Sequence, residues 1–313
     1  MVLDVARLGH NVLGTTLMSG IARGLHRMGL PLWTAAMPAK RRQPGPADLI
    51  PLNSQHSSSP APSLRVVYFP SCINQTMGLP RHPTAQRPLF DEMCQLLRKA
   101  GYEVIFPEGM DHMCCGQIWE SKGMLDIADR KSAELEAALW KASEEGKYPV
   151  LCDQSPCLHR MRKVMGTAEN EREQAQPATR MHLYEPAEFI MKYLVPRLAF
   201  HKTDRHIALH VTCSTRQMGV TEDLIALARM CSDNVYLPEG VGCCGFAGDK
   251  GFTHPEMNRY ALRKLRPQIE ANHIEVGYSN SRTCEIGLQA DTGIPYMSIA
   301  YLVNECTAAA APV

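Results

Sequence analysis

Twelve cysteines are spread over 313 residues, and eight of them form two sets with the same internal order. Each set has one cysteine, then an adjacent pair followed by glycine, then a further single cysteine. The members are Cys72, Cys114, Cys115 and Cys157 in the first set and Cys213, Cys243, Cys244 and Cys284 in the second. Disulfides between adjacent cysteines strain the backbone, so the pairs favour a metal or redox role over a disulfide scaffold.

Four thiolates per set suit a zinc ion or an iron–sulfur cluster, because both prefer soft sulfur ligands. Structural zinc sites usually take ligands from C-x₂₋₄-C knuckles, and neither set contains paired knuckles. Adjacent cysteines point in different directions, which suits several iron atoms better than one tetrahedral ion. We expect iron–sulfur ligation, with zinc as the alternative. Gly116 and Gly245, which follow the pairs, are expected to let the backbone approach the inorganic core.

Three further residues are weaker candidates for a place at these sites. Cys152 could supply a fifth ligand to the first set, although a buried, inert cysteine fits its strand-end position equally well. Lys122 and Lys250 follow the paired cysteines at similar offsets, seven residues after Cys115 and six after Cys244. A cluster held by four thiolates carries negative charge that a nearby cation would offset, so we hypothesise that these lysines tune the reduction potential. A solvated lysine at a helix start is the alternative.

The remaining cysteines and two histidines are expected to have structural roles. Cys94 and Cys231 lie among apolar residues at helical spacing and are predicted to belong to the core, whereas Cys306 is predicted to lie near a frayed carboxyl end. His159 and His210 flank cysteine loops and could replace a ligand or carry protons. A hydrogen-bonded or surface histidine is the commoner case.

The segments that position the cysteine sets are themselves repeated. Both Cys72 and Cys213 begin a C-x₄-M-G pattern, and each pattern follows a predicted strand. Each copy reads as strand, cysteine loop and helix, three times over. The predicted strands include 64–69, 148–152, 206–211 and 274–278, and the predicted helices include 125–143 and 255–271. Alternating strands and helices predict a parallel sheet whose carboxyl ends gather the cysteine loops at one edge.

We therefore predict an α/β protein with two pseudo-repeated domains, each a small parallel sheet flanked by helices, preceded by an N-terminal helical segment. The expected divisions are a basic amphipathic helix at 1–40, a Pro/Ser-rich linker at 41–63, a first cysteine-rich domain at 64–200 and a second at 201–313. The formal net charge of +1 gives no indication of nucleic-acid binding.

The N-terminal segment has many basic residues, several apolar residues at helical spacing and one acidic residue. The basic residues are Arg7, Arg23, Arg27, Lys40, Arg41 and Arg42, against Asp4 alone. A transit peptide, a membrane-surface helix and a helix docked on a neighbouring domain all fit this composition. No apolar run is long enough to span a bilayer. We expect a cytoplasmic protein, or one peripheral on the inner face of the cytoplasmic membrane.

The cysteine pattern resembles the CCG domain of heterodisulfide reductase subunits, of glycerol-3-phosphate and glycolate dehydrogenase iron–sulfur subunits, and of the carboxyl end of flavin-linked D-lactate dehydrogenases. The second copy resembles the last group most, in CCGFAGDKGF at 243–252, SNSRTCEIG at 279–287 and GIPY at 293–296. The fullest family pattern ends in C-x-x-C, but Gln154 and Ser281 stand at the first of those positions. This departure favours four-ligand [4Fe–4S] clusters over a five-ligand cluster.

The resemblance implies an electron-transfer module of a flavin-linked D-2-hydroxyacid dehydrogenase, with D-lactate as the preferred substrate. Electrons would pass from reduced flavin to a quinone or a cytochrome. The sequence lacks the flavin-binding domain and the ferredoxin-like C-x-x-C-x-x-C-x-x-x-C-P region of the whole enzymes, so FAD and the ferredoxin-like domain are expected in a partner domain or subunit. The alternatives are a zinc-stabilised assembly module and disulfide chemistry of the heterodisulfide reductase type.

Overall fold

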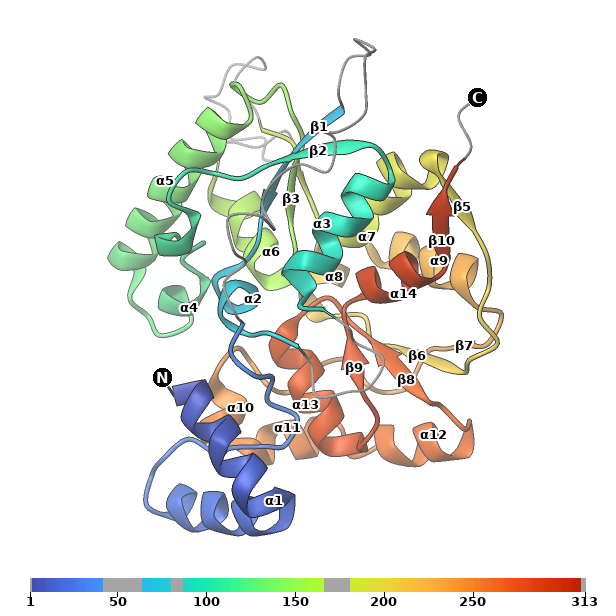
Figure 1. Ribbon diagram of the computed structural model, residues 1–313. Coiled ribbons are helices and arrows are strands. Elements are labelled where there is room, and N and C mark those ends of the chain that lie inside the picture. The colour runs from blue at the N-terminus through green and yellow to red at the C-terminus, as the bar shows by residue number, and fades with distance from the viewer. Residues whose placement is uncertain (1, 42–63, 80–86, 166–180, 311–313) are drawn as a thin grey trace.

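Two four-stranded parallel sheets with the same strand order form the frame of the molecule (Figure 1). The computed structural model describes residues 2–41, 64–79, 87–165 and 181–310. The first sheet has the order β2-β1-β3-β4 and the second the order β7-β6-β8-β9. The predicted α/β class, with matched parallel sheets and an N-terminal helix, is confirmed. The predicted linker lies outside the described residues, except for Arg41.

Each sheet has one strand more than the sequence pattern predicts. The first sheet contains β1 (Leu64–Phe69), β2 (Tyr102–Ile105), β3 (Val150–Cys152) and β4 (Leu183–Tyr184). The second contains β6 (Ile207–Leu209), β7 (Val235–Tyr236), β8 (Val276–Tyr278) and β9 (Tyr296–Met297). The unpredicted strands, β4 and β9, are two residues long and buried, so they are too short to show an alternating pattern.

The helices follow the strands in the same order in both copies. The first copy contains α2 (Cys72–Thr76), α3 (Leu89–Lys99), α4 (Gln117–Glu120), α5 (Leu125–Ala142), α6 (Ser155–Val164) and α7 (Pro186–Phe189). The second contains α8 (Cys213–Gln217), α9 (Thr221–Cys231), α10 (Lys250–Thr253), α11 (Pro255–Ala261), α12 (Leu265–Ala271), α13 (Arg282–Thr292) and α14 (Ile299–Glu305). The helix predicted at 255–271 is thus two helices. Pro267 lacks the N–H that a continuous helix would need at that position.

Three apolar clusters fill the space around the sheets. One lies between β1, β3 and the helices α5 and α6, and a second lies between the second sheet and α11, α12 and α13. The third is shared, since it includes Tyr68 and Leu97 of the first copy and Tyr278 and Leu302 of the second. In this shared core α14 packs on α3 and α7 packs on α9. The last helix of each copy therefore packs against a helix of the other copy. The two copies therefore share one continuous hydrophobic core.

A short antiparallel sheet joins the segment between the two copies to the carboxyl-terminal segment. It pairs β5 (Leu198–Phe200) with β10 (Thr307–Ala309) and lies outside both copies of the repeat. Cys306, at the end of α14, is 1% exposed, and its thiol donates to the carbonyl of Cys231. The expectation of a frayed position for Cys306 was wrong, because the β5–β10 pairing covers this part of the chain. Cys94 and Cys231 are buried in the shared core, as predicted.

The carboxyl ends of the two sheets meet at a buried polar seam, which we define by the residues that follow β3, β4 and β8. Gln154 Nε2 donates to Ser281 Oγ at 3.2 Å, and the Arg282 N–H donates to Gln154 Oε1 at 3.0 Å. The Ser155 N–H donates to the Asn280 carbonyl at 3.0 Å. Gln154 and Ser281 occupy equivalent positions of the repeat, so the two copies face each other in a pseudo-twofold arrangement.

Glu185 joins three elements within the seam. Its fully buried carboxylate accepts hydrogen bonds from Ser155 Oγ at 2.8 Å, from Asn280 Nδ2 at 2.6 Å and from the Ala187 N–H at 2.7 Å. The last bond caps the start of α7. Burial raises the pKa of Glu185, and these donors oppose that rise. A single carboxyl group thus connects α6, α7 and the loop after β8.

Arg282 connects the two cysteine sets through the seam. Its fully buried guanidinium donates from Nε to Asn74 Oδ1 at 3.1 Å and forms an ion pair between Nη1 and Glu285 Oε2 at 3.0 Å. Asn74 lies two residues after Cys72, and Glu285 directly follows Cys284. Burial raises the pKa of Glu285 to about 7, and Arg282 opposes that rise. Breaking such a buried pair costs more than replacing both partners.

Arg282→Met is therefore expected to lower the free energy of unfolding by about 3 kcal/mol or more, because Glu285 and Asn74 lose their buried partner. Adding Glu285→Leu should restore most of the loss, since the buried carboxyl is then gone as well. Urea unfolding followed by circular dichroism measures both. A double variant no more stable than Arg282→Met would contradict this account of the seam.

Candidate functional site

Each cysteine set gathers at the carboxyl end of its own sheet. Cys72 begins α2 directly after β1, Cys157 lies in the first turn of α6 after β3, and the adjacent pair lies in the loop after β2. Cys213, Cys284 and the second pair occupy the matching places around β6, β8 and β7. The structure thus brings together the four members of each set, which are distant in sequence. All twelve cysteines are free thiols.

The thiols of each set interact in a chain with the same order. In the first set the chain runs Cys72, Cys114, Cys115, Cys157, and in the second it runs Cys213, Cys243, Cys244, Cys284. The final contact of the second chain joins two Sγ atoms at 2.9 Å. In both sets the single cysteine that precedes the pair is exposed and the second cysteine of the pair is buried. Each site therefore has one side open to solvent and one side in the core.

The first cysteine of each pair is the preferred thiolate. The pKa of Cys114 is lowered because Cys115 and Cys72 hydrogen-bond to its sulfur, and the pKa of Cys243 is lowered because Cys213 and Cys244 do the same. The pKa of each of these neighbouring thiols is raised by the same contacts. The thiolate is the metal-binding form of cysteine, so each set contains one sulfur that is ready to bind a soft metal.

Backbone N–H groups stabilise these sulfur atoms. The Gly116 N–H donates to Cys114 Sγ at 3.4 Å, and the Gly245 N–H donates to Cys243 Sγ at 3.3 Å. The Phe246 N–H donates to Cys244 Sγ at 3.4 Å. Hydrogen bonds of this kind also set the potential of iron–sulfur clusters. The turn that follows each pair is thus built to favour negative charge on sulfur.

The glycines after the pairs are required by the helix packed behind each turn. Gly116 has φ 86°, and a Cβ there would lie 2.4 Å from the Ala128 carbonyl oxygen of α5. Gly245 has φ 68°, and a Cβ there would lie 2.6 Å from the Met257 carbonyl oxygen of α11. We expected the glycines to make room for an inorganic core. That stays a prediction, and the clash that the structure shows is with the helix.

Side chains from α5, α6 and α11 also hold the turns, and the sequence pattern did not reveal them. Ser132 Oγ and Arg160 Nε donate to the Cys115 carbonyl at 2.8 and 3.1 Å. Asn258 Nδ2 donates to the Cys244 carbonyl at 2.6 Å. Ser132 lies 17 residues after its cysteine and Asn258 lies 14 after its own, so a comparison of the copies at fixed offset could not have found them.

Asp153 holds the loop that presents Cys72. Its buried carboxylate accepts from the Ser71 N–H at 2.9 Å and from Tyr68 Oη at 2.7 Å. Burial raises its pKa, and the donors oppose the rise. The equivalent residue in the second copy is Asn280, which belongs to the seam. A signal was present in the sequence, because both positions lie four residues before the last cysteine of a set.

Cys152 lies outside the chain of thiols in the first set. It is fully buried among apolar side chains, and its thiol contacts the Gln154 carbonyl oxygen at 3.9 Å. Burial raises its pKa. Gln154 and Ser281, which replace the fifth cysteine of the fullest family pattern, bond to each other in the seam. A fifth ligand from Cys152 therefore stays a prediction, and the geometry favours four thiols per set.

The two lysines have different surroundings. Lys122 Nζ forms an ion pair with Asp249 Oδ2 at 2.8 Å, across the gap between the turns of the two copies. Both side chains are about half exposed, so this pair contributes little to stability. Lys250 is exposed at the start of α10. The hypothesis that these lysines tune a cluster stays a prediction, and the partner of Lys122 weakens it for that residue.

His210 distinguishes the second set from the first. It is buried at the end of β6, with Nδ1 3.0 Å from Ser279 Oγ and Nε2 without a hydrogen-bond partner among the described residues. Phe69 and Cys152 occupy the matching positions in the first copy. Burial lowers the pKa of His210 to about 4. His159 is half-buried, and burial lowers its pKa as well.

The donor sets match the chemistry of a soft-metal centre, although they are not arranged around one ion. Within the described ranges, no three His, Cys, Asp or Glu side chains are placed to hold a single metal ion. Two thiolates on one zinc ion lie about 3.8 Å apart, given Zn–S bonds of about 2.3 Å. The 2.9 Å contact between Cys244 Sγ and Cys284 Sγ is shorter than this.

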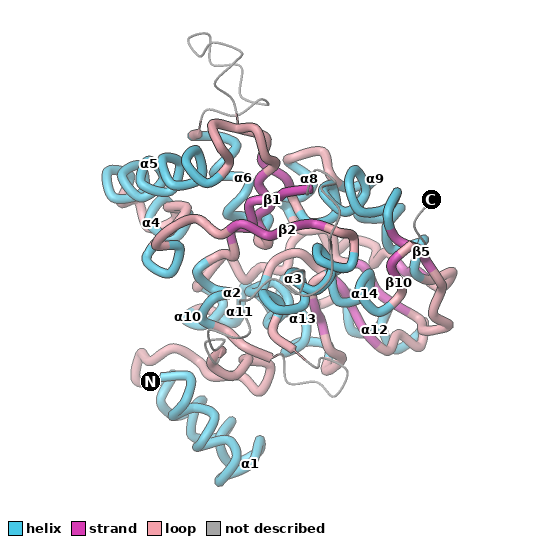
Figure 2. Tube along the Cα trace, turned by 45° about the horizontal axis from the view of Figure 1, so that its top comes forward, coloured by secondary structure: helices cyan, strands magenta, loops and turns pink. Residues whose placement is uncertain are grey.

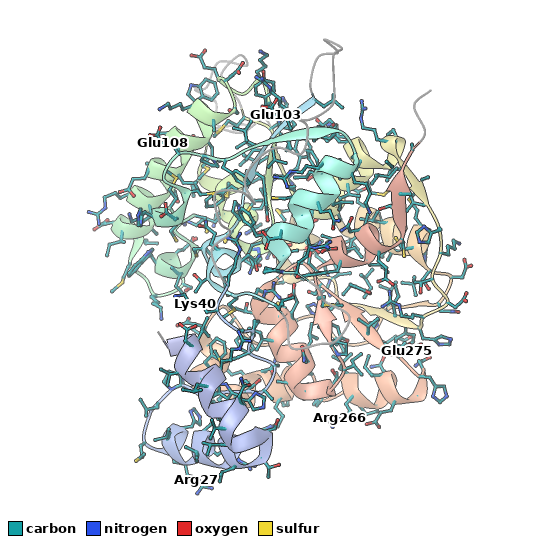
Figure 3. All side chains as sticks on the ribbon, in the orientation of Figure 1. Arg27, Lys40, Glu103, Glu108, Arg266 and Glu275 are labelled. Carbon is teal, nitrogen blue, oxygen red and sulfur yellow. The ribbon has the colours of Figure 1, made fainter. Side chains whose placement is uncertain are left out.

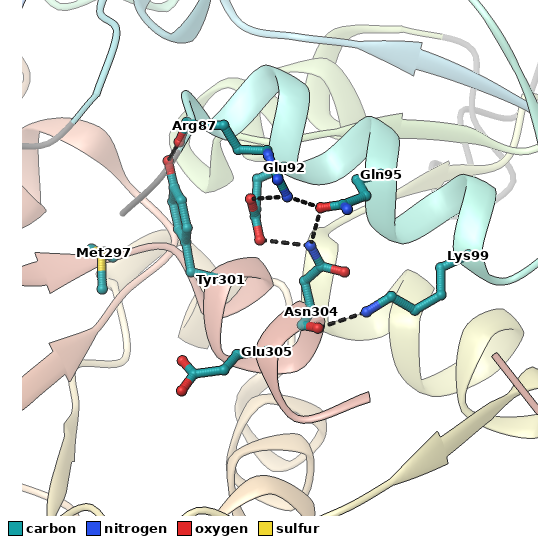
Figure 4. A pocket seen from close by; sticks show the side chains of 8 residues that line it. All are labelled: Arg87, Glu92, Gln95, Lys99, Met297, Tyr301, Asn304 and Glu305. Carbon is teal, nitrogen blue, oxygen red and sulfur yellow. Dashed lines mark hydrogen bonds and ion pairs between the residues drawn. The ribbon is translucent and has the colours of Figure 1, made fainter. Parts of the chain in front are cut away.

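A polar pocket of about 450 Å³ lies between α3 and α14, apart from the cysteines (Figure 4). The Asn304 amide donates to Glu92 and Gln95 at 2.6 and 2.8 Å, and Lys99 Nζ donates to the Asn304 carbonyl at 2.6 Å. Arg87 faces Glu92 at 3.6 Å. Lys99 Nζ also donates to the Thr307 carbonyl, and Glu305 pairs with Arg205 outside the pocket. Each charged group of the pocket thus has a partner, which suits a structural contact between the two copies.

The glycine geometry predicts a difference between paired substitutions. Gly123 and Gly248 also have positive φ, but a Cβ on either would meet nothing within 4 Å. Gly123→Ala and Gly248→Ala should cost only the left-handed backbone penalty, about 1–2 kcal/mol. Gly116→Ala and Gly245→Ala should cost about 1–3 kcal/mol more, because the added methyl group must displace a helix. Urea unfolding measures the loss of stability in each variant. If Gly116→Ala cost no more than Gly123→Ala, and Gly245→Ala no more than Gly248→Ala, the steric explanation would be disproved.

The buried histidine predicts a pH-dependent difference in stability. His210→Phe combined with Ser279→Cys installs the pair found in the first copy. In the unfolded chain His210 binds a proton near pH 6.5, whereas burial delays protonation in the folded chain to about pH 4. As pH falls through this window, the wild type should lose up to about 3 kcal/mol relative to the variant. Parallel stability profiles for the two proteins would contradict this account of His210.

Comparison with known proteins places these observations in a family. A family described as a CCG cysteine-rich domain matches residues 66–162 and 207–289, together more than half of the chain. Lactate utilization protein A from Oceanobacillus iheyensis is 24% identical over 186 residues, which cover 58% of this chain and 73% of that protein.

Solved structures resemble the chain only remotely. An aspartate racemase homologue from Pyrococcus horikoshii OT3 gives a TM-score of 0.30 at 10% identity, covering 78% of this chain and 96% of its own. The Picrophilus torridus aspartate racemase gives 0.33 at 8% identity, covering 79% and 96%. Likeness at this level carries no information on activity. The family match agrees with the two cysteine sets, each of which lies within one matched segment. The chain belongs to the CCG cysteine-rich domain family.

Proposed function

We propose that this chain is the iron–sulfur electron-transfer component of a lactate-oxidising system. Its eight matched cysteines would hold two [4Fe–4S] clusters. The observation that carries the proposal is the gathering of four thiols, in the same order, at the carboxyl end of each sheet. A cluster bound there would accept and release one electron at a time.

Three properties of the chain's own residues support iron over zinc. The thiols in each set come from three separate loops rather than from paired knuckles. The adjacent cysteines differ in burial and in pKa, so they are not equivalent ligands. Backbone N–H groups point at the sulfur atoms, as they do in proteins that set the potential of a cluster.

The number of ligands follows from the seam. Gln154 and Ser281 stand where a fifth cysteine would lie, and each is engaged by the other copy. A ligand at either position would have to break the contact that joins the two sheets. We therefore favour four thiolates at each site.

The substrate class and the partners come from the resemblance and from the relative. The relative is named for lactate utilisation. A flavin-bearing partner would remove hydride from D-lactate, because the thiols of this chain cannot do so. The reduced flavin would then give up its two electrons singly to this chain. We propose a quinone or a cytochrome as the acceptor.

Metal content tests the proposal directly. Protein reconstituted anaerobically should contain about eight iron atoms and about eight sulfides, with broad absorption near roughly 400 nm. Cys114→Ala and Cys243→Ala should each remove about half of the iron, because each removes the preferred thiolate of one set. Cys94→Ala is the matched control, since Cys94 is buried in α3 outside both sets. Zinc without iron in protein purified anaerobically would contradict the proposal.

A further inference from the structure

The N-terminal helix is the part of the molecule that the proposed function does not use. α1 (Val2–Arg27) is interrupted at Gly14, whose φ of 71° and ψ of 171° are not helical. We call its two arms, residues 2–13 and 15–27, the hairpin. His10 Nε2 lies 2.7 Å from Thr15 Oγ1 across the break. Figure 2 shows α1 at the outside of the molecule.

Both arms of the hairpin expose a stripe of aliphatic side chains. Val5, Leu8 and Val12 follow one face of the first arm, and Leu17, Ile21 and Leu25 follow one face of the second. These side chains are 39–73% exposed. Nine of the fourteen large apolar residues exposed in the described ranges lie between residues 5 and 30. An apolar surface of this kind marks an interaction site.

The charges of the hairpin are complementary to an anionic surface. Arg7, Arg23 and Arg27 are exposed, and the one acidic residue, Asp4, pairs with Lys40 at 3.8 Å. At helical spacing, Arg23 and Arg27 lie on a different face from the stripe of the second arm. Figure 3 places Arg27 at the far tip of α1 and Glu103 and Glu108 at the opposite end of the molecule.

A cavity beneath the hairpin is lined almost entirely by apolar groups. It measures about 430 Å³, and its lining includes Leu3, Ala6, Met18, Trp33 and Phe252. The Leu32 N–H donates to the Phe252 carbonyl at 2.6 Å, which fixes the hairpin to α10. The hairpin is therefore a supported structure with an apolar interior and an apolar outer surface.

From these observations we infer that the hairpin docks this chain on the surface of an anionic lipid bilayer. Basic residues beside an exposed aliphatic stripe are the pattern of helices that lie in the membrane interface. A partner protein is the less favoured occupant, because protein interfaces are enriched in aromatic residues and α1 has none. None of the described helices has the length and apolarity needed to cross a bilayer.

The hairpin is joined to the second cysteine set through α10. α10, which supports the hairpin, begins six residues after Cys244, and Phe246 contacts Phe252 with ring centroids 4.8 Å apart. This path runs from the hairpin through Phe252 and Phe246 to the second set. If the proposed electron transfer holds, this arrangement favours an acceptor that is dissolved in the membrane.

Vesicle binding by the full chain tests the inference. Vesicles of phosphatidylglycerol and phosphatidylcholine should sediment the wild type, and vesicles of phosphatidylcholine alone should do so poorly. Leu8→Glu combined with Ile21→Glu should weaken binding about a hundredfold or more, because two aliphatic side chains no longer enter the interface. Arg23→Gln and Arg27→Gln should each weaken it about fivefold on anionic vesicles.

Leu125→Glu is the matched control, because Leu125 is 56% exposed outside the hairpin and receives the same change. It should bind as the wild type does. Circular dichroism establishes that each variant is folded, and iron content reports the cysteine sites separately, so loss of vesicle binding with full iron content separates the two proposals. A wild type that stays in solution with anionic vesicles, or a Leu8→Glu/Ile21→Glu variant that binds unchanged, would overturn the inference.

Discussion

The hydrogen-bonded seam between the carboxyl ends of the two sheets is the constraint on which the rest of the structure depends. Parallel strands place their following loops at one edge, and here two such edges are pressed against each other. Polar groups buried at such a place must all find partners, since an unpaired one is costly. Glu185 and Asn280 meet this demand by bonding across elements, and Arg282 meets it through Nε and Nη1, although Nη2 has no hydrogen-bond partner among the described residues. The register between the two copies is thereby fixed.

The seam also determines what the cysteine loops can do. Residues within it lie one to four positions from Cys157 and Cys284, so neither terminal thiol can move without disturbing the contact between the sheets. The opposite side of each set is exposed through Cys72 and Cys213. Each site is therefore held in place on the side of the seam and accessible to solvent on the opposite side. A group that accepts electrons from one partner and releases them to another needs both properties.

Much of this arrangement could be predicted because the sequence contains an internal repeat, so that its two copies can be compared with each other. The repeated C-x₄-M-G and CCG segments indicated two copies, and the rule for parallel sheets brought distant cysteines to one edge. β4 and β9 were not predicted, because a strand of two residues is too short to show an alternation of buried and exposed side chains. The partners of the Cys115 and Cys244 carbonyls were missed because Ser132, Arg160 and Asn258 satisfy the same need from unmatched positions. The steric role of Gly116 was not predictable either, since it depends on how closely α5 approaches.

The central claim is that the chain holds two separate redox sites, one in each cysteine set. Electron paramagnetic resonance of the dithionite-reduced, reconstituted protein tests it most directly, with Cys114→Ala and Cys243→Ala measured beside the wild type. The account predicts a signal from each of two iron–sulfur centres in the wild type and from one in each variant, with the surviving centre differing between the variants. Loss of all signal in either single variant, or a wild type with no iron–sulfur signal, would contradict it.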